Sequence, residues 1–185
     1  MNLQASALLS LLQLASPSLP VGAYSYSQGL ESAIENGTVK DESSAHAWII
    51  QVLEEIITQF EAPVLWRLLH AFAQQDYESA KYWSEIFIAS RDTAEFRAEI
   101  IQMGYSLSKL ILDLKICDEE CQKFITSQTD ISFLTAYAAA AVAFHIEPEA
   151  ALLSMLFSWV ENQVLVCVKS VPLGQVSGQR LLLSL

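Results

Sequence analysis

The amino-acid sequence predicts an all-α fold, a single-domain helical bundle of about eight to nine helices spanning residues 1–185. Apolar residues recur at helical spacing along most of the chain, and proline and glycine separate the periodic segments. Strand signals are weak, since the β-branched run Val164–Val168 lies within a longer helical register. A chain of this length fits one domain and can bury about 70% of its unfolded surface.

The first helix is predicted to end near Ala15, and the second to begin near Gln28. Pro17 and Pro20 each fix φ and lack an N–H donor, so a helix cannot continue through them. The hydroxyl of Ser27 can cap a helix that starts at Gln28. The residues between these points are therefore expected to form an irregular segment.

The middle of the chain contains the clearest helical stripe. One apolar face comprises Trp48, Ile49, Val52, Leu53, Ile56, Ile57 and Phe60. Pro63 is expected to interrupt this helix, after which the same spacing resumes from Val64 to Phe72. Residues 77–90 and 94–114 are also predicted to be helices.

The last third of the chain is predicted to be helical as well. Residues 136–144 are mostly alanine, the best helix former, whose small side chain allows close packing. Pro148 suits the first turn of a long apolar helix that reaches Val168, and Gln179–Leu185 begins another helical pattern. The acidic segment Asp118–Asp130 is expected to be a mobile loop or a short surface helix.

Composition restricts the class of partner and the compartment. The net charge of −11 disfavours nucleic acid as a partner, because phosphates require a basic surface. No Lys or Arg precedes Lys40, which argues against a targeting peptide, and three cysteines suit a reducing cytoplasm. The apolar runs 133–146 and 152–168 are respectively too short and too interrupted for a membrane span of about 20 residues. We therefore expect a cytoplasmic protein with no membrane partner.

Motifs for catalysis or nucleotide binding are missing from the sequence. It contains no Gly-x-x-x-x-Gly-Lys-Ser/Thr, no Gly-x-Gly-x-x-Gly and no Gly-x-Ser-x-Gly. Cys117 and Cys121 provide only half of a tetrahedral metal site, and the histidines His46, His70 and His145 are scattered. We expect no enzyme activity, no catalytic residue, no cofactor and no metal site, which leaves binding to other proteins.

Three polar segments are candidates for that binding. The first, Leu14–Glu31, places a Tyr-Ser-Tyr-Ser cluster directly before Gln-Gly-Leu-Glu at a helix start. The second, Arg91–Glu99, is either a solvated helix face or a recognition face, with Arg91 and Glu95 spaced as an attractive i,i+4 pair. The third is Lys169–Leu182, which contains Lys-Ser-Val-Pro-Leu-Gly-Gln and then Gly-Gln-Arg-Leu-Leu.

These three segments resemble the signatures of the UreF family, urease accessory proteins that help to load nickel into urease. The three matches keep their order and span Leu14 to Leu182, nearly the whole chain. The second segment is similar to the family's Arg-Glu-Thr-x-Glu-Leu-Arg-x-Glu, with Asp92 in place of the usual Glu.

The resemblance implies a non-enzymatic adaptor. In that family a homodimer binds an accessory protein of the UreD/UreH type. Together they recruit the UreG-type GTPase and dock on apo-urease, coupling GTP hydrolysis to nickel insertion. Glu31 and Lys169 match residues on the face implicated in controlling the GTPase. The resemblance gives as partner-binding candidates Tyr24, Ser25, Tyr26, Gln28, Glu31, Arg91, Glu95, Arg97, Lys169, Gln175, Gln179 and Arg180.

One departure and two alternatives accompany this interpretation. Family members usually continue past the Gly-Gln-Arg motif into a tail containing Tyr and Arg, whereas this chain stops shortly after the motif. The first alternative is a helical GTPase-regulating adaptor with a different target, using Arg91, Arg97 or Arg180 as an arginine finger. The second is a hydrolase using Ser25 or Ser27, although no activating base lies near either serine in the sequence.

Overall fold

The structure, a computed structural model, describes residues 5–22 and 27–185, and every regular element in these two ranges is a helix. In chain order the elements are α1 (Ala5–Leu14), α2 (Leu30–Glu35), α3 (Glu42–Val52), η2 (Leu53–Glu61), α4 (Ala62–Ala73), α5 (Tyr77–Ala89), α6 (Ala94–Leu114), α7 (Glu119–Ser127), α8 (Phe133–Ala143), α9 (Pro148–Ser170) and α10 (Gln175–Ser184). Because α3, η2 and α4 run end to end as one rod, the eleven elements of the described residues make nine helical rods. The predicted all-α fold is confirmed.

The rod from α3 to α4 continues past Pro63, where the sequence predicted an interruption. The stretch just before it, η2, is π-helical, with N–H groups bonded to carbonyls five residues back and a wider turn. Pro63 lacks an N–H, and its ring would crowd the carbonyl of Gln59 in an α-helix. The local switch to π-helical bonding accommodates the proline, so the predicted break was wrong.

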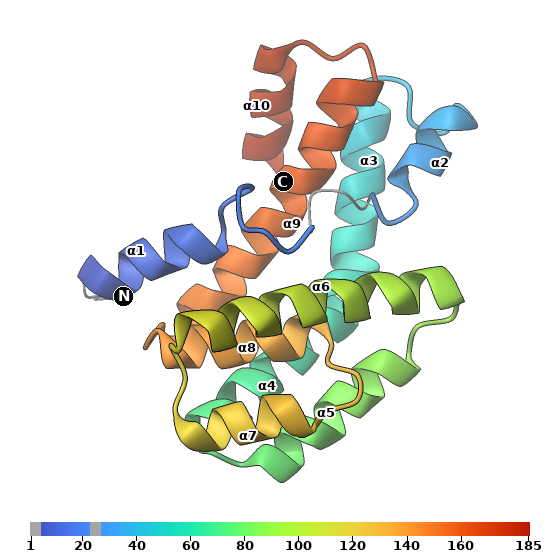
Figure 1. Cartoon of the computed structure of the whole chain (residues 1–185). Helices are drawn as coiled ribbons and strands as arrows, with labels where there is room; N and C mark the ends of the chain where they lie inside the picture. The colour runs from blue at the N-terminus through green and yellow to red at the C-terminus, as the bar shows by residue number, and fades with distance from the viewer. Residues whose placement is uncertain (1–4, 23–26) are drawn as a thin grey trace.

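Two hydrophobic cores lie at the two ends of this rod and of α9. Figure 1 shows the two corresponding layers of helices, with α3 in the upper one and α4 in the lower one. The upper layer consists of α2, α3, α10 and the C-terminal half of α9, and its core contains Leu30, Ala33, Val39, Ala45, Ile49, Val160, Val164, Cys167, Val171 and Leu181. The lower layer consists of α4 to α8, covered at one end by α1, and it holds the larger core. The boundary between the layers is where the candidate site lies.

The helix α9 connects the two layers. It begins with Pro148 in its first turn, as predicted, and packs against α1, α2, α3, α4, α8 and α10. By length and composition it alone among the described helices is apolar enough to cross a membrane, a test that core helices of globular proteins also pass. The chain itself buries 39% of this apolar stretch.

Several predicted boundaries agree with the structure and others shift. The helix α6 has the predicted ends, and the alanine-rich α8 packs closely against it, as expected. At their contact, Gly104 of α6 faces the backbone of Ile131, and a Cβ atom there would overlap the Ile131 carbonyl. The acidic segment after α6 contains the helix α7. The last helix begins at Gln175, earlier than predicted.

Candidate functional site

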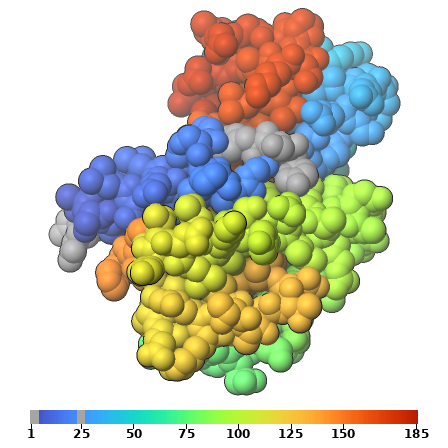
Figure 2. Space-filling model, in the orientation of Figure 1, coloured from blue at the N-terminus to red at the C-terminus, as the bar shows by residue number. Residues whose placement is uncertain are grey.

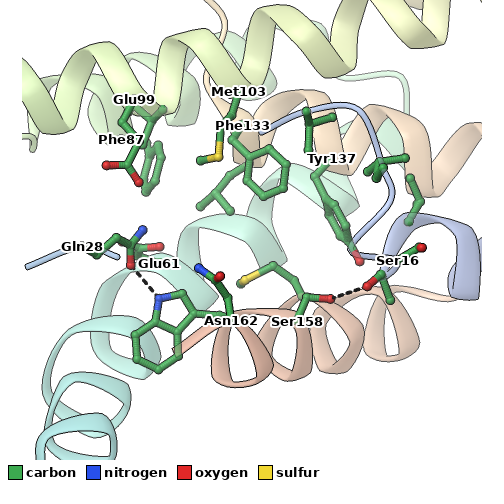
Figure 3. A pocket seen from close by; sticks show the side chains of 18 residues that line it. Ser16, Gln28, Glu61, Phe87, Glu99, Met103, Phe133, Tyr137, Ser158 and Asn162 are labelled. Atoms are coloured by element: carbon green, nitrogen blue, oxygen red, sulfur yellow. Dashed lines mark hydrogen bonds between the residues drawn. The ribbon is translucent and has the colours of Figure 1, made fainter. Parts of the chain in front are cut away.

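A cavity of about 80 Å³ lies between the two layers (Figure 3). Its walls come from the segment after α1, from Gln28, and from η2, α5, α6, α8 and α9. The polar side chains in its lining are Ser16, Gln28, Glu61, Glu99, Tyr137, Ser158, Trp159 and Asn162. Figure 2 shows the segment after α1, in blue, lying across this face between the C-terminal helices and α6. Described residues of the first polar segment, Ser16 and Gln28 among them, therefore line this cavity.

Glu61 and Arg91 form an ion pair at the edge of the cavity. Arg91 Nη2 lies 2.9 Å from Glu61 Oε1, and both side chains are largely buried, with 15% and 10% exposed. The Arg91 guanidinium also stacks 4.2 Å from the centre of the Phe87 ring. Burial raises the pKa of Glu61, and the Arg91 charge opposes that shift. Removal of either partner would leave a buried charge without compensation.

Glu99 is the second buried carboxyl group. It is 8% exposed, and its Oε1 has no hydrogen-bond partner among the described residues. Loss of hydration raises its pKa to about 7, and the nearby Glu61 charge contributes to the rise. A hydrogen bond from Gln28 and the charge of Arg91 act in the opposite direction. Glu99 thus changes its charge near neutral pH.

Gln28 connects this buried acid to α9 and to the start of α2. Trp159 Nε1 donates a 2.6 Å hydrogen bond to Gln28 Oε1, which leaves the Gln28 amide nitrogen to donate to Glu99. Figure 3 shows the Glu99 carboxyl directed toward Gln28. The backbone of Gln28 has φ of 50° and that of Gly29 has φ of 91°, both left-handed. A left-handed residue with a Cβ is strained, and such strain persists where other contacts hold it.

The other described candidates of the first and third segments lie in the upper layer. Glu31 is exposed in the first turn of α2, and Lys169 is exposed in the last turn of α9. Gln175 and Gln179 are exposed on α10. Both α2 and α10 pack on α9, so the layer brings together residues far apart in sequence.

Arg180 of α10 is tied to α3. Its Nη2 lies 3.4 Å from Glu42 Oε2 and donates to Ser177 Oγ at 2.8 Å. The hydrogen bond from Arg180 lowers the pKa of Glu42. This exposed contact links α10 to α3 within the upper layer, beside the packing of Leu181 in its core.

The UreF family model matches residues 39–185. A urease accessory protein UreF from Janthinobacterium sp. (strain Marseille) is 67% identical over 183 residues, covering 99% of this chain and 81% of that protein. One from Nitrosospira multiformis is 60% identical over 179 residues, covering 97% and 79%. A third, from Dechloromonas aromatica, is 47% identical over 181 residues, covering 96% and 78%.

The chain belongs to the UreF family. Its relatives are named as urease accessory proteins, so its role is in urease maturation. By family it is an accessory protein rather than a catalytic enzyme. The resemblance stated from the sequence is confirmed.

Two expectations about the charged segment of this UreF family member change with the structure. Arg91 precedes α6 and pairs with Glu61, so the expected Arg91–Glu95 pair is not formed. Glu99 is buried because it lies on the face of α6 that packs over the cavity. Glu95 and Arg97 are exposed in the first turns of α6, as expected.

Ser27 acts near the start of α2 but not as a cap at Gln28. Gly29 is the N-cap residue, and Ser27 Oγ accepts from the Glu31 N–H at 3.4 Å and donates to Glu31 Oε2 at 3.1 Å. The predicted helix start was two residues early, because the left-handed Gln28 and Gly29 precede the helix. The candidates Tyr24, Ser25 and Tyr26 lie outside the described residues.

Sequence reasoning missed Glu61 and Trp159. Glu61 is the only acid in the run Phe60–Leu65, and its position directly before Ala62-Pro63 was a usable signal of a buried charge. Trp159 lies in the apolar pattern of α9 and gave no sign of its hydrogen bond to Gln28.

The described residues contain no group of three or more His, Cys, Asp or Glu side chains placed to hold a metal ion. Cys117 and Cys121 are buried next to each other, and loss of hydration raises the pKa of both thiols. Thiols held in the neutral form are poor metal ligands, since the thiolate is the form that binds.

Proposed function

We propose that the chain is the adaptor of a nickel-delivery complex. It binds a UreD/UreH-type accessory protein, the UreG-type GTPase and apo-urease, and it modulates GTP-coupled nickel insertion without catalysing a reaction itself. The observation that carries the proposal is the upper layer. Glu31 lies far in the sequence from Lys169 and Gln175, yet all three are exposed on helices that share one core.

The exposed charges of this layer are poorly explained by stability. Lys169 forms no ion pair with any described residue, and the Glu31 side chain is hydrogen-bonded to Ser27. Each suits its helix end, an acid in the first turn of α2 and a base in the last turn of α9. Exposed charges of this kind contribute only about 0–1 kcal/mol to folding. They are therefore free to serve recognition.

An apolar ridge offers a second surface for a protein partner. It consists of Leu8, Leu9 and Leu12 of α1 with Leu153 and Phe157 of α9, all at least 43% exposed. The two helices pack against each other, and the spacing of four residues places Leu8 with Leu12 and Leu153 with Phe157. Contiguous exposed apolar surface is typical of protein interfaces. The ridge supports an interface either with a second copy of the chain, in the proposed homodimer, or with a partner subunit. The molar mass of the purified chain in solution distinguishes them, because only the first gives the mass of a dimer.

The adaptor function is tested by urease activation in a reconstituted mixture of apo-urease, the accessory proteins, nickel and GTP. Glu31→Ala and Lys169→Ala are expected to reduce activation several-fold and to alter GTP turnover, with unchanged far-ultraviolet circular dichroism. Matched controls are Glu78→Ala, an acid in the first turn of α5, and Lys109→Ala, an exposed lysine of α6. Normal activation and GTP turnover with both test variants would refute the assignment of the upper layer. Capture of an unrelated GTPase instead of the urease partners would favour the alternative adaptor.

A further inference from the structure

The buried cluster contains more acid than base. Glu61 and Glu99 contribute two carboxyl groups, and Arg91 is the one cationic group that faces them among the described residues. The other polar side chains around the cavity on α8 and α9 are uncharged at neutral pH: Tyr137, Ser158, Trp159 and Asn162. A buried carboxylate without a cation favours its protonated form. Since Arg91 pairs with Glu61 at 2.9 Å, Glu99 is the carboxyl that takes the proton.

Gln28 is placed to couple the protonation state of Glu99 to the turn that ends in the exposed Glu31. Its side chain lies between Trp159 and Glu99 inside the molecule. Its backbone is part of the strained turn that ends in Glu31, which is hydrogen-bonded to Ser27. Glu99 in the core and Glu31 on the surface are thus joined through one short turn. Movement of Gln28 away from Glu99 would also admit water to the cavity.

We propose that Gln28 is the positioning residue of the turn Ser27–Glu31, of which Glu31 is the exposed residue, and that a proton on Glu99 holds this turn in the conformation seen here. When Glu99 ionises, its carboxylate gains hydration if Gln28 withdraws, and the turn opens more often. Burial is the largest influence on the pKa of Glu99, so it outweighs the opposing effect of the hydrogen bond that Gln28 donates to the ionised form. The turn is therefore tighter at lower pH and looser at higher pH.

Any effect of this coupling on partner binding through Glu31 rests on the proposed function. The coupling itself is a property of the isolated chain. It can be measured without a partner, so failure of one proposal does not depend on the other.

Amide hydrogen exchange of the purified wild-type chain is the direct test. The N–H of Leu30 bonds to the carbonyl of Ser27 at 3.1 Å, and that of Ala33 bonds to Gly29 at 3.0 Å, so both report opening of the turn. After correction for intrinsic exchange, the protection of these two amides is expected to fall about five- to tenfold between pH 6 and pH 8. Linkage gives this range if the pKa of Glu99 drops from about 7 in the closed turn to between about 4.5 and 6 in the open one. The indole N–H resonance of Trp159 is expected to titrate with the same midpoint.

Two variants and one control define the residues involved. Glu99→Gln keeps the shape and removes the charge, so protection is expected to stay at its low-pH value throughout. Gln28→Met keeps the length and removes both hydrogen bonds, so protection is expected to be low at both pH values. Asp113→Asn, an exposed acid on the same helix as Glu99, is expected to titrate like the wild type.

The outcomes that overturn the proposal are specific. Constant protection in the wild type, or an unchanged pH response in Glu99→Gln, would show that Glu99 does not control the turn. Protection that rises with pH would show that the hydrogen bond to ionised Glu99 outweighs its burial, which reverses the proposed sign. If a variant fails to fold, the wild-type titration still decides whether the turn responds to pH and in which direction, since constant or rising protection overturns the proposal.

Discussion

The folding stability of the whole chain is expected to fall as the pH rises, because of Glu99. Its pKa is raised from 4.5 to about 7 by burial in the folded chain. Between these two values the folded state binds more protons than the unfolded state, so stability decreases as the pH increases through the window. The contribution is fully present below about pH 4.5 and is lost by about pH 7. Linkage across this window gives a loss of about 2–3 kcal/mol between about pH 5 and about pH 8.

Urea denaturation followed by circular dichroism measures this loss. Other groups also titrate, so the informative quantity is the difference between the wild type and Glu99→Gln at each pH. That difference is expected to favour the variant increasingly as the pH rises, by about 2–3 kcal/mol over the window. Asp113→Asn controls for removal of one negative charge from α6. A pH-independent difference between the wild type and Glu99→Gln would refute the reasoning, because the carboxyl would then have the same pKa in both states.

Two further predictions concern folding. Gly104→Ala is expected to lower the melting temperature, because the added Cβ atom would overlap the Ile131 carbonyl and force α6 away from α8. The expected cost is about 1–3 kcal/mol of folding free energy. An unchanged melting temperature would show that the helices separate freely. Arg91→Ala is expected to cost about 3–5 kcal/mol in urea denaturation, because it leaves Glu61 buried without a cation. Adding Glu61→Gln is expected to recover part of that loss, whereas additive losses would mean that the pair does not interact.

The helices could be predicted from the sequence because their signals are local. Apolar spacing and capping residues define α6, and Pro148 marks the start of α9. The continuation of the rod through Pro63 could not be predicted from the sequence. It depends on the π-helical hydrogen bonds of η2, for which the sequence gave no signal. A proline normally signals a break, and here the tertiary contacts of the rod favour continuation.

The candidate site could be predicted only in part, because its chemistry depends on packing. The sequence identified the Gln28 segment and the Arg91–Glu99 segment separately. It gave no means of placing Arg91 against Glu61, or Glu99 beneath Gln28, because these contacts join η2, α6 and the start of α2. A charged residue on a helix is usually solvated, and both interpretations of Arg91–Glu99, a solvated face or a recognition face, followed that general preference.

Glu99 is difficult to explain by stability alone. It lies in a largely apolar cavity, one of its oxygens has no described partner, and its ionisation opposes folding near neutral pH. Burying a charge costs free energy unless the charge is paired, so a methionine at this position would serve the core at least as well. What a methionine would lack is a charge that responds to pH beside Gln28. The feature that distinguishes the carboxyl from an apolar substitute is thus its link to the turn bearing Glu31, and the site is better understood through that link than through the core.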